Sequence, residues 1–160
     1  VDQRVFACVD DPFEPNETAD DPTPLGADPT RVEGAWLCDR VPAEADTYAF
    51  QVAAGTTRTV ASTFLFGDDG DLAIEIYDAA GAFLGTTAGV ARANSKQCII
   101  IDSFGADRTL HARIVPLDIN RVLQDDERLD YAIEILDGDG CDQLPPAAPG
   151  VEWPHILPPM

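Results

Sequence analysis

Basic side chains are scarce in this sequence. Its 160 residues include 10 Lys and Arg against 29 Asp and Glu, which gives a formal net charge of −19 at pH 7. A surface of that sign repels polyanions such as nucleic acid, and it disfavours anionic lipid surfaces for the same reason. We therefore expect no nucleic-acid partner.

Long apolar runs are lacking too. No stretch approaches the ~18 consecutive apolar residues that a membrane-spanning helix needs, so we expect no direct membrane insertion. The first residues, VDQRVFACVDD, do not show the charged and apolar regions of a signal peptide. If the protein is exported, we expect its signal peptide to have been removed already.

Residues suited to catalysis are few. The histidines are His111 and His155, and the pattern around His111 is that of an outward-facing strand residue. No serine lies in a nucleophile-elbow motif such as G-x-S-x-G. The cysteines have no nearby basic partner that would activate a thiol. We expect a protein that is not an enzyme.

The four cysteines include no C-x-x-C pair, the spacing that usually marks a zinc site. Two disulfides fit their wide separation better, although four buried free thiols in a cytosolic protein remain an alternative. Of the three possible connectivities we favour Cys8 with Cys141, which would tie the ends together, and Cys38 with Cys98. Disulfides imply an oxidising compartment, so we expect an extracytoplasmic protein: periplasmic, cell-surface or secreted.

The sequence does contain repeated alternation of apolar and polar residues with a period of two, which predicts half-buried β-strands. The alternating residues are Tyr48, Phe50 and Val52; Leu72, Ile74 and Ile76; and Tyr131, Ile133 and Ile135. Further β-branched or aromatic segments are bounded by Gly, Asp and Asn turns. We predict an all-β fold, an antiparallel β-sandwich of about eight strands over residues 34–142.

Proline-rich segments flank this predicted sandwich. Residues 1–33 form an N-terminal strap and lead-in, whose stretch DDPFEPNETADDPTPL cannot be a helix or a central strand because its prolines lack backbone donors. Residues 143–160 form an extended, proline-rich C-terminal arm. Its apolar residues have no local core to enter, so we expect the arm to dock on its own sandwich or on another chain. These residues are Trp153, Ile156, Leu157 and Met160.

Several segments in this order resemble one known family. They are EPNETADDPTPL, VEGAWLCD, AEADTYAFQVAAGTTRTV and GDDGDLAIEIYDAAGAFLGTT. Together they look like the bacterial pre-peptidase C-terminal domain, a jelly-roll-like β-sandwich often appended to secreted peptidases. The resemblance covers approximately residues 11–136. It extends to the collagen-binding domains of collagenases, which are similar to this family.

Collagenase members of that family bind calcium through the strap. Carried over residue by residue, the resemblance implies ligands at Glu14, Asn16, Glu17 and Asp46. Carboxylate and amide oxygens suit calcium, which takes six to eight oxygen ligands. The pattern is incomplete, because Pro12 and Ala43 stand where those members carry acidic ligands. In the alternative interpretation the Asn side chain satisfies turn amides and no metal is bound.

These observations predict a non-catalytic, extracytoplasmic structural or interaction subunit, in which a disulfide-linked sandwich docks its C-terminal arm on partner subunits of a larger assembly. Two alternatives stay open. One is a calcium-dependent binding module for a polysaccharide or a fibrous protein, which aromatic residues in a row on one sheet face would favour. The other is an accessory domain of a secreted peptidase.

Overall fold

The computed structural model describes most of the chain. The described residues are 12–13, 15–16, 18, 20–38, 45–64, 72–88, 96–102, 104–116, 128–141 and 152–157. Residues 38, 64, 128 and 129 are described by their backbone alone. Within these ranges every regular element longer than one turn is a strand. No helix of the described part is long and apolar enough to cross a membrane.

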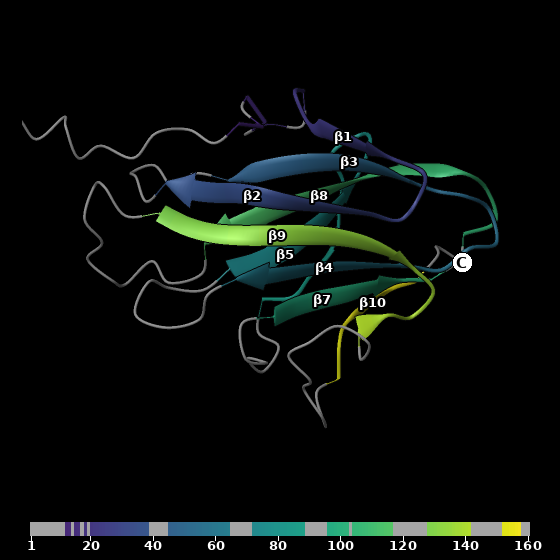
Figure 1. Cartoon of the computed structure of the whole chain (residues 1–160). Coiled ribbons are helices and arrows are strands. Elements are labelled where there is room, and N and C mark those ends of the chain that lie inside the picture. Colours follow the sequence, from purple (N-terminus) through teal and green to yellow (C-terminus); the bar gives the residue numbers. More distant parts are fainter. Residues whose placement is uncertain are drawn as a thin grey trace, which may run out of the picture.

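Ten strands form two five-stranded sheets that face each other (Figure 1). The first sheet has the order β1-β3-β8-β5-β6. Its strands are β1 (Thr23–Gly26), β3 (Asp46–Val52), β8 (Arg108–Pro116), β5 (Leu72–Asp78) and β6 (Phe83–Thr86). The second sheet has the order β10-β7-β4-β9-β2. Its strands are β10 (His155–Ile156), β7 (Lys96–Ile101), β4 (Arg58–Phe64), β9 (Arg128–Asp137) and β2 (Thr30–Cys38).

The all-β sandwich predicted from the sequence is confirmed, with ten strands instead of about eight. The sheets are mixed, because β1 pairs with β3 and β10 pairs with β7 in parallel. Both strands come from the proline-rich flanks, outside the predicted range 34–142. Each lies at a sheet edge, where a strand pairs on one side only and tolerates a neighbouring proline.

The core lies between the sheets and takes the alternating residues as predicted. Tyr48, Phe50 and Val52 of β3 are fully buried, while Gln51 between them is exposed. Corresponding residues of β5 and β9 meet them in the same cluster. Burial of such side chains contributes roughly 1.5–3 kcal/mol each, and this apolar burial is the main force that holds the two sheets together.

In β2 the ladder to β9 shifts register between Val32 and Ala35. Gly34 lies in this irregularity with φ = 76°, a conformation that favours glycine. The extra residue restores the alternation so that Ala35 and Leu37 both enter the core.

Candidate functional site

The structure brings together two of the four predicted calcium ligands. Asn16 and Asp46 are both fully buried, and the backbone N–H of Thr47 donates to the Asn16 carbonyl oxygen at 2.6 Å. The strap therefore lies against the start of β3. Glu14 and Glu17 fall outside the described residues, and in the part of the chain that is described no three His, Cys, Asp or Glu side chains gather as a metal site.

Asp46 also belongs to a polar network inside the sandwich. The Tyr131 hydroxyl donates to its carboxylate, and the hydroxyls of Tyr48 and Tyr131 lie 2.6 Å apart. Burial, the neighbouring Tyr48 and the Asp46 carboxylate raise the pKa of Tyr131 well above its ordinary value of 10.0. The network joins the strap end of β3 to β9 across the core.

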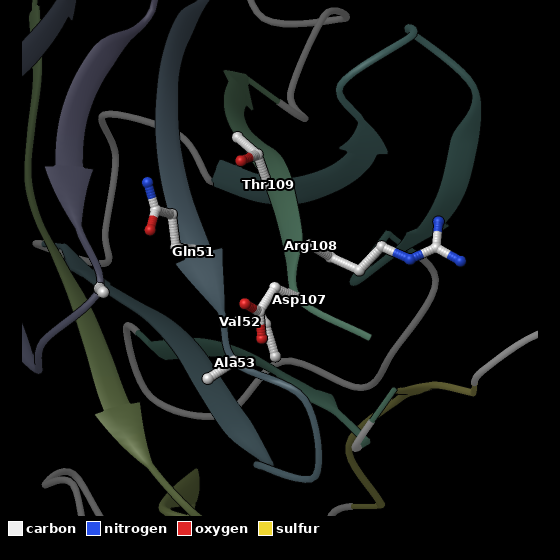
Figure 2. A pocket seen from close by; sticks show the side chains of 7 residues that line it. Gln51, Val52, Ala53, Asp107, Arg108 and Thr109 are labelled. Carbon is white, nitrogen blue, oxygen red and sulfur yellow. The ribbon is translucent and has the colours of Figure 1, made fainter. Parts of the chain in front are cut away.

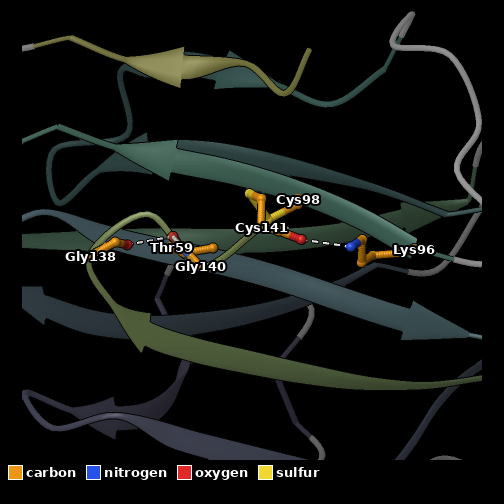
Figure 3. The surroundings of a disulfide bond; sticks show 6 residues. All are labelled: Thr59, Lys96, Cys98, Gly138, Gly140 and Cys141. Atoms are coloured by element: carbon orange, nitrogen blue, oxygen red, sulfur yellow. Dashed lines mark hydrogen bonds between the residues drawn. A yellow bond between two sulfur atoms is a disulfide. The ribbon is translucent and has the colours of Figure 1, made fainter. Parts of the chain in front are cut away.

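The predicted cysteine pairing is wrong. Cys98 bonds to Cys141, with a Cα–Cα distance of 5.8 Å (Figure 3). Neither Cys8–Cys141 nor Cys38–Cys98 is compatible with that bond; Cys8 itself lies outside the described residues.

The sheet order explains the observed disulfide. Cys98 lies on β7 directly opposite Ala61 of β4, while Cys141 follows β9, which pairs with the other side of β4. The turn after β9 is fixed to β4, because the Thr59 hydroxyl donates to the Gly138 carbonyl oxygen at 2.6 Å and accepts from the Gly140 N–H at 2.8 Å (Figure 3). The segment after β9 thus passes over β4 and brings Cys141 next to Cys98 on β7.

Residues 152–157, the described part of the C-terminal arm, dock on the sandwich of their own chain. Trp153 is 6% exposed and packs with Ala61, Ile100 and the Cys98–Cys141 disulfide. The Lys96 ammonium lies 5.7 Å from the centre of the Trp153 ring and donates to the Cys141 carbonyl oxygen at 2.6 Å. These contacts form on the face of the second sheet that is turned away from the core.

The backbone of the arm completes the second sheet. The N–H groups of Ile100 and Asp102 donate to the carbonyls of Pro154 and Ile156 at 3.0 and 2.9 Å, and the Ile156 side chain enters the main core. Trp153 and Ile156 are thus buried within their own chain, where the edge of β7 offers backbone partners and an apolar surface, and their predicted contact with a partner stays a prediction. Met160 lies outside the described residues.

One edge of the sandwich, which we call the β6/β10 edge, exposes apolar side chains. A Cβ placed on Gly85 of β6 would clash with Cδ1 of Ile156 of β10, so these two edge strands approach closely. Beside this contact, Leu84 is 37% and Leu157 is 71% exposed. Among the predicted partner-binding residues that are described, Leu157 is the one that the structure leaves open to a partner.

A second cluster lies on the outer face of the first sheet, the face turned away from the core. Its members are Thr47, Glu75, Tyr77, His111 and Arg113. Tyr77 donates to Glu75 Oε1 at 2.9 Å. Burial and the Glu75 carboxylate raise the pKa of Tyr77, an effect that Arg113 partly opposes. His111 faces outward as predicted, yet it is only 7% exposed.

A pocket of about 400 Å³ opens where β3 ends and β8 begins (Figure 2). Figure 2 shows Gln51 and Thr109 side by side on the two strands, while Arg108 extends away from them, toward the Phe104 ring at 5.3 Å. The Asp107 carboxylate accepts a hydrogen bond of 2.8 Å from the Ala54 backbone N–H, which holds the two loops at the rim of the pocket together. No sequence pattern indicated this pocket.

Among the described residues considered for catalysis, Ser62 and His111 lie on different sheets. Ser62 is fully buried on the inner side of the second sheet, whereas His111 lies on the outer side of the first. His155 Nδ1 lies 2.9 Å from a carboxylate oxygen of Asp102, which follows β7. Ser95 and Ser103 lie outside the described residues.

No protein-family model matches the sequence, and no curated protein matches it. Similar solved structures include the pre-peptidase C-terminal domain of a collagenase from Bacillus anthracis, with 12% identity and a TM-score of 0.48 over 71% of this chain and 92% of that one. Another is PliG of Aeromonas hydrophila, a periplasmic inhibitor of g-type lysozyme, with 8% identity and a TM-score of 0.40 over 72% and 96%. At such TM-scores these likenesses assign neither a family nor a function, so membership of the pre-peptidase family stays a prediction.

Proposed function

We propose that this chain is a non-catalytic, extracytoplasmic interaction domain that binds a protein partner through its β6/β10 edge. One observation carries the proposal: Leu84 on β6 and Leu157 directly after β10 are exposed beside the Gly85–Ile156 contact. Leu84 precedes and Leu157 follows one residue of that contact in the sequence, and exposed large apolar side chains on adjoining edge strands offer apolar area to a protein partner. Edge strands also offer unpaired backbone groups to an extended segment.

Charge defines the partner further. Asp78 ends β5 beside β6, Asp102 and Glu152 lie next to β10, and the whole chain carries a net charge of −19. A partner segment with apolar side chains between Lys or Arg residues matches this surface, because the long-range attraction speeds the encounter and the apolar contacts slow dissociation.

The Cys98–Cys141 disulfide supports the extracytoplasmic part of the proposal. It lies buried under Trp153, and disulfides of this structural kind persist in oxidising compartments. The separation of Ser62 from His111 on different sheets supports the non-catalytic part. We assign the arm a structural role in place of the partner contact predicted for Trp153.

Selection from a displayed random-peptide library tests the proposal. We expect enriched peptides to combine apolar residues with Lys or Arg, and to bind the wild-type protein but not the double variant Leu84→Ser/Leu157→Ser. Phe83→Ser is the matched control, because Phe83 is exposed but lies on the outer face of the first sheet beside Tyr77. Enriched peptides that bind the double variant equally well, or no enrichment at all, would overturn the proposal.

A further inference from the structure

The outer face of the first sheet carries a set of polar groups whose hydrogen bonding is incomplete. Thr47 and Glu75 flank Arg113 in one cross-strand row, and Ala49 and Tyr77 flank His111 in the next. Thr47 Oγ1, His111 Nδ1 and Arg113 Nε are buried and have no hydrogen-bond partner. Because an unmade buried hydrogen bond is costly, such groups at adjacent positions call for an explanation.

An aromatic platform borders these groups. Phe83 of β6 packs edge-to-face on Tyr77, with ring centres 5.6 Å apart, and Phe83 is 55% exposed. Tyr77 is held in turn by its hydrogen bond to Glu75. The exposed Phe83 ring is thus held in place by Tyr77, which lowers the entropy lost when the ring binds a ligand.

The pocket of Figure 2 extends the same face. Gln51 and Thr109 are the next outward-facing residues of β3 and β8 after Ala49 and His111, and both are exposed. Its volume of about 400 Å³ falls in the range of small-molecule sites, roughly 300–1,000 Å³. The row of Ala49, His111, Tyr77 and Phe83 therefore lies between the Thr47–Arg113–Glu75 row on one side and Gln51 and Thr109 of the pocket on the other.

The charge and the hydrogen-bonding groups of this outer face indicate which class of ligand it can bind. Glu75 and Arg113 offset each other's charge, and the net charge of −19 opposes a polyanion. The hydroxyl, carboxylate, guanidinium and amide groups offer both donors and acceptors. A sugar hydroxyl is itself both donor and acceptor, and one face of a pyranose ring is apolar. We propose that this outer face, from Phe83 to the Gln51–Thr109 pocket, binds a neutral saccharide.

In this site Phe83 stacks on the apolar face of a sugar ring. Glu75, Tyr77 and Arg113, which are half-buried, bind its hydroxyls. The site includes neither Leu84 nor Leu157, so saccharide binding goes beyond the proposed partner binding, and either function can fail without the other.

An array of neutral oligosaccharides, followed by isothermal titration calorimetry with the best binder, tests the inference. We expect Phe83→Ala to weaken binding about tenfold or more, the change that loss of one aromatic contact produces. Arg113→Met, which keeps the side-chain length but removes the donors, is expected to weaken it similarly. Leu157→Ser is the matched control and should bind as the wild type does.

Two further readouts keep the test independent of folding. The thermal unfolding of each variant should stay close to wild type, and the His111 imidazole NMR signals should shift on addition of the saccharide. The inference is overturned if no neutral oligosaccharide binds at millimolar concentration. It is also overturned if the binding survives Phe83→Ala unchanged, or if the His111 signals stay fixed while an oligosaccharide binds elsewhere.

Discussion

Tyr131 and Asp46 are 85 residues apart in the sequence, yet the Tyr131 hydroxyl donates a hydrogen bond to the Asp46 carboxylate inside the sandwich. Both residues are buried, so this bond links the second sheet to the strap end of the first where water does not compete.

Replacing Tyr131 with Phe tests that link. The change removes a donor to a buried carboxylate and the contact to the Tyr48 hydroxyl, so we expect the free energy of unfolding to fall by about 1.5–3 kcal/mol. Urea unfolding measures the loss. Tyr77→Phe, which removes a half-buried hydroxyl, serves as the control and should cost less. Equal losses for the two variants would contradict the special role of the buried network.

Alkaline pH should destabilise the protein through Tyr131. Its pKa is raised in the folded state, so the folded protein holds the phenolic proton more tightly than the unfolded chain does. Stability is therefore expected to fall as the pH rises above the ordinary value of 10.0, and to go on falling until the folded-state pKa is passed. Spectrophotometric titration should show Tyr131 ionising together with unfolding. Its ionisation near pH 10 in the intact fold would contradict the structure.

Peptide mapping without reductant should recover Cys98 linked to Cys141. Any second disulfide within the chain has to join the two remaining cysteines, Cys8 and Cys38. The double variant Cys98→Ser/Cys141→Ser should lose about 2–5 kcal/mol of stability, the range typical of native disulfides. Recovery of Cys38 linked to Cys98 would overturn the sheet order around β4 and β7.

Trp153→Ala should destabilise the fold itself. Trp153 is buried against the disulfide and under the Lys96 ammonium, so its loss is expected to cost about 3 kcal/mol. Leu157→Ala, at the exposed end of the same segment, should stay within about 0.5 kcal/mol of wild type. Thermal or denaturant unfolding separates the two. A stable Trp153→Ala variant would mean that the arm does not depend on this contact.

Calcium binding at the strap remains a proposal that rests on the resemblance and on the buried pair Asn16 and Asp46. If the ion binds, excess calcium raises the melting temperature by mass action, and Asp46→Asn abolishes the rise. Magnesium at the same concentration is the control for ionic strength. An identical melting curve with calcium and with chelator would leave the strap with a structural role alone.

Local sequence pattern was enough to predict the strands of the central region and the faces of their alternating side chains, but not the edge strands β1 and β10. The period-two alternation at Tyr48, Phe50 and Val52 depends on local geometry alone, because successive strand residues point to opposite sides wherever the strand is placed. The same alternation placed His111 on an outer face. The family resemblance implied that Asn16 and Asp46 are ligands of one calcium site; the structure places Asn16 against Thr47, the residue after Asp46, and the calcium site itself stays a prediction.

Which strands become neighbours depends on the complete fold. Cys141 bonds to Cys98 because β4 lies between β7 and β9, and Trp153 is buried because the edge of β7 was open to β10. The row of Thr47, Arg113 and Glu75 likewise requires β3, β8 and β5 to lie side by side in register. Alternation determines which face of a strand a residue occupies, but it does not determine the order of the strands in a sheet. These contacts therefore depend on long-range strand pairing, which involves the whole chain.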